Sequence, residues 1–125
     1  MSSTPTLQAL AVEARDAFGE DGTPRASNTP SSFDVVVDVY SREGNRASGE
    51  GVDSHACAEL TRALGGTEEA PTGLRLAVQS FVSRTLQFLR AQYPDSNGVK
   101  QDQRLLSTLF WGHLVEARYV WPNPG

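Results

Sequence analysis

Residues 99–121 read VKQDQRLLSTLFWGHLVEARYVW, and this stretch decides the fold. Most of its apolar side chains recur at steps of three and four, which places them on one stripe of an α-helix. The stripe comprises Leu106, Leu109, Phe110, His113, Leu114, Ala117, Val120 and Trp121. A second group widens it and consists of Leu105, Trp111 and Val115. A helix that is apolar around most of its circumference is normally buried on two sides. We therefore expect this segment to be the central helix of the fold, or the helix through which two copies meet.

The N-terminal segment predicts a short helix followed by a linker. Thr4 as N-cap and Pro5 at the first helical position form a start signal, and Gly19 ends an apolar stripe over residues 7–18. Residues 20–32 are rich in Ser, Thr, Pro and Gly and hold almost nothing to bury, which is typical of a mobile segment.

Residues 33–40, FDVVVDVY, carry the strongest strand signal in the chain. Every second side chain from Phe33 is apolar, and Val35, Val37 and Val39 fall on one face of a strand. A strand needs a neighbour for its backbone hydrogen bonds. We expect that neighbour to be a weak return strand around residues 46–48, or the same strand of a second copy.

Two more helices are predicted before the final one. Asp53 is suited to the N-cap of a helix that Gly65 and Gly66 close, and a longer helix covers residues 74–93. The turn after this longer helix is short, so we expect it to form an antiparallel αα-hairpin with the final helix.

Together these signals predict a mainly helical α+β fold. It would contain one strand or hairpin and three to four helices, of which the last two form the antiparallel αα-hairpin. Residues 1–32 would form the N-terminal helix and the mobile Ser/Thr/Pro-rich linker, and residues 33–125 a single globular domain.

Composition argues against several classes of protein. A net charge of −4 makes a nucleic-acid binder unexpected, because phosphate contacts rely on clustered Lys and Arg. No apolar run approaches the roughly 20 residues that a membrane span needs, and no signal peptide is evident. The lone Cys57 forms no internal disulfide. These features predict a cytoplasmic protein without membrane contact, and the Arg-, Ala- and Gly-rich composition suggests a bacterial or phage origin.

The groups able to carry chemistry are few. His55 and Glu59 are four residues apart on the predicted helix and would offer two metal ligands, and His113 or Glu116 from the final helix could complete the site. Cys57 and His113 could pair as nucleophile and base if the fold brings them together. The alternatives are a solvated pair of side chains, a small buried cysteine and a core histidine. A small enzyme using these His, Cys and Glu side chains, with or without a metal, therefore remains the alternative function.

The leading functional hypothesis is a non-enzymatic protein–protein interaction or assembly module. Assembly factors, chaperones, antitoxin or immunity proteins and phage accessory proteins all fit. We expect no catalytic residue, metal or cofactor, and a homo-oligomer, with a dimer favoured, that binds a protein partner of unknown identity. The expected contact residues lie on the strand and the final helix: Val35, Val37, Val39, Phe110, Trp111, Val115, Tyr119 and Trp121.

Overall fold

The chain folds as an assembly of helices. The computed structural model describes residues 4–19, 21–23, 31–43, 50–94 and 97–120, and within them it contains five helices and no β-strand. The helices are α1 (Leu7–Phe18), α2 (Ser32–Glu43), α3 (Glu50–Ala63), α4 (Thr72–Gln92) and α5 (Asn97–Val120). The predicted α+β fold is therefore wrong, because the segment expected to form the strand is helix α2.

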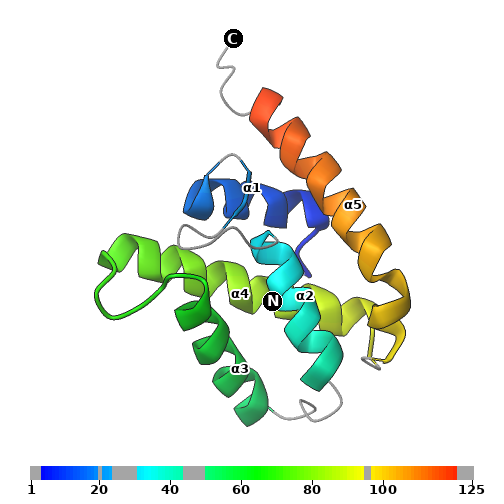
Figure 1. Ribbon diagram of the computed structural model, residues 1–125, viewed down its shortest axis with the longest axis horizontal. Coiled ribbons are helices and arrows are strands. Elements are labelled where there is room, and N and C mark those ends of the chain that lie inside the picture. The colour runs from blue at the N-terminus through cyan, green and yellow to red at the C-terminus, as the bar shows by residue number, and fades with distance from the viewer. Residues whose placement is uncertain (1–3, 20, 24–30, 44–49, 95–96, 121–125) are drawn as a thin grey trace.

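Helix α4 lies at the centre of the arrangement (Figure 1). It packs against α1, α2 and α3, whereas α5 packs against α1 and α2 and runs along one edge of the molecule. The final helix is therefore not the central one. One of its sides lies against the core, and none of the described helices lies against the opposite side.

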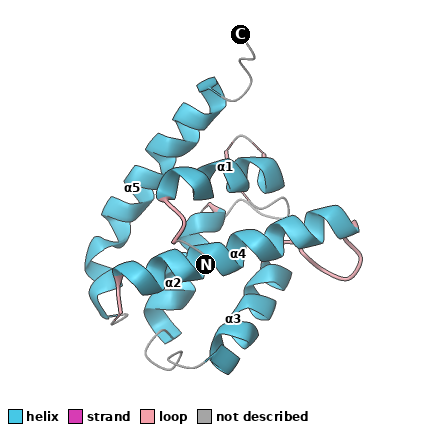
Figure 2. Ribbon diagram, turned by 180° about the vertical axis from the view of Figure 1, so that it is seen from behind, coloured by secondary structure: helices cyan, strands magenta, loops and turns pink. Residues whose placement is uncertain are grey.

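The predicted αα-hairpin is also wrong. Helices α4 and α5 meet only near their short connection and then diverge, as the view from behind in Figure 2 shows. Helices α1 and α2 each contact both α4 and α5, so they occupy the angle between them. A short turn brings two helices close at one end only, and here the inserted helices hold the other ends apart.

The strand signal failed because the same residues also fit a helix. Phe33, Val36, Val37 and Tyr40 follow the helical spacing of three and four, and all four are buried in the core. Asp34 and the exposed Asp38 leave the opposite side polar. The apolar positions therefore match both the strand period of two residues and the helix period of 3.6 residues. Helix α2 forms because one helical face fills the space between α4 and α5.

Helix α2 also has a capping group at its start. The Ser31 side-chain oxygen accepts a hydrogen bond from the backbone N–H of Asp34 at 3.3 Å, and the Ser31 hydroxyl donates to the Asp34 carboxylate at 3.0 Å. This arrangement satisfies a backbone donor that the first turn of a helix leaves free.

Simple magnitudes show why packing overrides the β-propensity of the valines. A β-branched residue in a helix costs at most about 0.7 kcal/mol relative to alanine. Complete burial of one Val or Phe side chain contributes roughly 1.5–3 kcal/mol. Since Phe33, Val36 and Val37 are all buried in α2, their burial outweighs the propensity cost of its four valines.

Helix α1 belongs to the same core. Its N-cap is Thr6 instead of the expected Thr4, and the Thr6 side-chain oxygen accepts a hydrogen bond from the N–H of Ala9 at 3.1 Å. The expected end is confirmed, because Gly19 follows the last helical residue with a φ of 110°. The small buried residues Ala11 and Ala14 let α1 lie close to its neighbours. Most of the predicted linker, residues 20 and 24–30, lies outside the described residues.

The end of α3 confirms the predicted glycine stop. Gly65 has a φ of 101°, which favours glycine. The N–H of Gly66 donates to the carbonyl of Thr61 at 2.7 Å, and the N–H of Gly65 donates to the carbonyl of Arg62 at 3.2 Å. These two bonds form a Schellman motif, which satisfies carbonyls at the helix end.

Candidate interaction surface

The outward side of α5 carries a group of apolar residues. Leu105, Leu109 and Val115 leave 57%, 45% and 48% of their surface exposed, and Trp111 beside them is half-buried. We call these four residues the α5 strip. Large apolar residues gathered on one helix face are typical of sites that bind another surface.

The opposite side of α5 is buried in the core. Leu106, Phe110, Leu114 and Ala117 are all buried there. The apolar region of α5 is broader than one helix face, but the described part of the chain covers only one side of the helix. Leu109 was expected on the covered side and instead lies on the exposed one.

The position of α5 is fixed at its beginning by two tyrosines. The Tyr40 hydroxyl of α2 donates to the backbone carbonyl of Tyr93 at 2.6 Å, and the Tyr93 hydroxyl donates to the Asp102 carboxylate of α5 at 2.9 Å. Burial raises the pKa of Tyr93 from 10.0 to about 12, with further contributions from the hydrogen bond to Asp102 and from its negative charge. No local sequence pattern predicts this connection, because it joins three separate segments of the chain.

A charged pair joins α1 to α4. The guanidinium of Arg84 on α4 donates to the carboxylate of Glu13 on α1, and both side chains are partly buried. Both residues lie on helices of the central packing, and neither belongs to the α5 strip.

The valines expected at a strand interface lie elsewhere. Val37 is buried, and the partly buried Val35 and Val39 pack against the core from α2. Because the strand does not exist, self-association through strand pairing has no structural basis in this fold.

The contact residues expected on the final helix divide into three groups. Phe110 is fully buried and stacks on Phe33, so it is not available at the surface. Trp111 and Val115 belong to the α5 strip. The side chain of Tyr119 and the whole of Trp121 lie outside the described residues.

The candidate catalytic and metal-binding groups do not come together in the described structure. Cys57 lies on α3 against the Gln79 carbonyl of α4, and Glu59 forms an ion pair with Arg62 at 3.2 Å. His113 lies on α5, on the far side of the molecule from α3, where its Nδ1 atom is 3.4 Å from the Glu116 carboxylate (Figure 1). The side chain of His55 is not described. Among the described residues, no group of three or more potential metal ligands is present.

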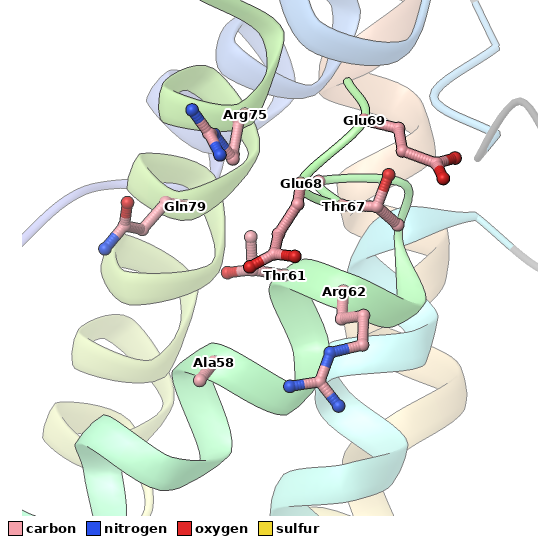
Figure 3. Close-up of a pocket in the computed structure, with 9 residues that line it drawn as sticks. Ala58, Thr61, Arg62, Thr67, Glu68, Glu69, Arg75 and Gln79 are labelled. Carbon is pink, nitrogen blue, oxygen red and sulfur yellow. The ribbon is translucent and has the colours of Figure 1, made fainter. Parts of the chain in front are cut away.

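An open cleft of about 660 Å³ lies between α3, the α3–α4 connection and the start of α4. In Figure 3, Arg75 and Gln79 stand on the α4 wall, Arg62 on the α3 side and Glu68 between them. The side chain of Glu68 is exposed, and Arg62 is already paired with Glu59. The cleft therefore offers mixed charges at the surface and no enclosed apolar wall of the kind that holds most small ligands.

Comparisons with protein-family models, with curated proteins and with solved structures gave no match to this chain. Among the described helices, none has the length and apolar character required to span a membrane. The function is therefore inferred from the surfaces that the fold presents.

Proposed function

We propose that the chain is a non-enzymatic protein–protein interaction module that binds through the α5 strip. One observation carries the proposal: three large aliphatic side chains remain about half exposed on the outward side of a helix whose inward side is fully packed. In a monomer these side chains expose apolar area to water at a cost in free energy. A partner that covers them removes this cost.

The size of the gain sets the expected strength of each contact. Full burial of a Leu or Val side chain contributes roughly 1.5–3 kcal/mol, so covering the exposed half contributes about 1 kcal/mol per residue. A change of about 1 kcal/mol alters a dissociation constant roughly fivefold. Trp111 adds a large aromatic side chain of the type enriched in binding hot spots.

The charge around the α5 strip favours an apolar protein surface as the partner. The strip itself is uncharged, and exposed charges of both signs stand at its ends, with Lys100 and Arg104 before it and Glu116 after it. Nucleic acid and anionic lipid would require a cluster of basic side chains at this place. The arrangement instead resembles the apolar centre and charged rim of a protein interface.

Site-specific photocrosslinking in the full chain tests the proposal without knowledge of the partner. A photoreactive amino acid at Leu109 should give a discrete adduct in cells. The matched control is Leu76 on α4, an exposed leucine with 58% of its surface free that lies outside the α5 strip. Equal adducts from both positions, or none from either, would overturn the proposed function.

A further inference from the structure

The exposed residues of α5 have the spacing of a helix-pairing seam. Leu105, Thr108, Gly112 and Val115 are separated by steps of three, four and three, and all four are exposed. This is the alternation of the a and d positions of a heptad, which keeps one line of residues facing a partner helix. Leu109 and Trp111 lie on either side of the line. The outward side of α5 is thus patterned for contact with another helix.

The order of these residues is self-complementary. If two copies of α5 run antiparallel with their centres at residue 110, Leu105 of one copy faces Val115 of the other, and Thr108 faces Gly112. Leu109 and Trp111 then flank the two-fold axis, each near its own symmetry mate. Every member of the α5 strip therefore meets an apolar side chain, as a symmetric dimer interface requires.

The two flanks of the seam support the same direction. Trp111 lies on one flank, and Glu116, seven residues after Leu109, lies on the other. A parallel arrangement would bring Trp111 of one copy next to Glu116 of the other, whereas the antiparallel arrangement brings each flank against the same flank of the second copy. Antiparallel pairing therefore keeps Trp111 beside an apolar side chain.

Gly112 provides space at the centre of the seam. A Cβ atom added to Gly112 would have nothing within 4 Å among the described residues, so the packing described for this chain does not require a glycine there. In the middle of a helix glycine costs roughly 0.5–1 kcal/mol relative to alanine. Together with the short side chain of Thr108, it lets a second helix approach closely at this point.

We infer that the partner of the α5 strip is a second copy of this chain, paired antiparallel through α5. This inference rests on the proposed function. The contact involves little more than one side of about three helical turns, which places it at the low end of specific interface sizes. The dimer is accordingly in equilibrium with the monomer and forms as the protein concentration rises.

Disulfide trapping tests the direction of the pairing. In a Cys57→Ser background of the full chain, Leu105→Cys and Val115→Cys are made separately and oxidised alone or as an equimolar mixture. In the antiparallel dimer each introduced thiol is about 15 Å along the helix axis from its own symmetry mate, from the rise of 1.5 Å per residue. We expect each variant alone to stay uncrosslinked and the mixture to give the mixed disulfide dimer. Leu76→Cys mixed with Val115→Cys is the control and should give no mixed disulfide.

Two results would overturn the inference. Self-crosslinked Leu105→Cys and Val115→Cys without enrichment of the mixed species would show parallel pairing. Absence of the mixed disulfide, together with a monomeric mass of the wild-type chain at every concentration, would show that no such dimer exists. In that second case a discrete photocrosslink from Leu109 to another protein would leave the proposed function intact, so the two failures are distinguishable. Circular dichroism of each cysteine variant verifies that the fold is kept.

Discussion

The ring of Phe33 lies flat on the ring of Phe110, with centroids 4.4 Å apart and planes 7° from parallel. This contact joins the second residue of α2 to the middle of α5, and both side chains are fully buried. Because Phe110 points inward, the residues on the other side of α5 point outward. The stacked pair therefore connects the packing of the core with the exposure of the α5 strip.

A valine scan tests whether residues 32–43 are helical. Val36→Ala and Val37→Ala each remove two buried carbon groups and should lower the free energy of unfolding by about 1–2 kcal/mol, at about 0.8 kcal/mol per group. Val35→Ala should change it little, because Val35 is only half-buried and alanine is the better helix former. Urea denaturation measures all three. Equal losses for Val35 and Val37 with none for Val36 would instead be the pattern of a strand.

The sequence predicted the helices whose apolar residues fit only one period. In α4 and α5 the apolar residues recur at steps of three and four over some 20 residues, and only a helix fits this spacing. Glycines that follow α1 and α3 predicted where those two helices end. Residues 33–40 satisfy periods of two and of 3.6 at once, so a local pattern could not decide between strand and helix. The choice depends on the space between α4 and α5, which only the tertiary structure defines.

The same limit applies to the candidate surface. The excess of apolar residues on α5 was visible in the sequence, but which of them face outward depends on how α1 and α2 pack on the helix. Leu109 falls near the edge of the buried stripe, and a small rotation of the helix decides its exposure. The heptad spacing of Leu105, Thr108, Gly112 and Val115 is the sequence signal that marks the outward side.

Alkaline pH should weaken the connection between α2, α4 and α5. The pKa of Tyr93 is raised to about 12 in the folded chain from an ordinary value of 10.0. Between these values the unfolded chain releases the proton while the folded chain keeps it, so stability is fully present below pH 10 and falls as the pH rises through 12. Thermal unfolding across this range should show a smaller decline in Tyr93→Phe than in the wild-type chain.

Asp102→Asn gives a direct check on the cause of this shift. Removing the carboxylate charge should bring the pKa of Tyr93 closer to 10.0, although burial would still hold it above that value. The ultraviolet absorbance of tyrosinate, taken as the difference from a Tyr93→Phe chain, measures the titration. An unchanged titration in Asp102→Asn would show that the negative charge of Asp102 contributes nothing, because the asparagine oxygen can still accept the hydrogen bond.

Gly112→Ala should have opposite effects on folding and association. In the monomer it should raise the free energy of unfolding by roughly 0.5–1 kcal/mol, because alanine is the better helix former and nothing occupies the added space. In the antiparallel dimer the added methyl group separates the two helices and should weaken association. Gly73→Ala in the first turn of α4 is the control: its added Cβ also has nothing within 4 Å, and association should be unchanged. Tighter association in Gly112→Ala would contradict the close approach proposed there.

Sedimentation equilibrium over a wide concentration range tests the central claim most directly. The wild-type chain should pass from the mass of one chain to that of two as its concentration rises, whereas Leu109→Asp should remain monomeric because it places a charge in the apolar contact. Leu76→Asp, an equally drastic change at an exposed leucine outside the α5 strip, should associate like the wild-type chain. A wild-type chain that stays monomeric throughout, or a Leu109→Asp variant that dimerises as well as the wild-type chain does, would contradict the account of α5 as a self-pairing helix.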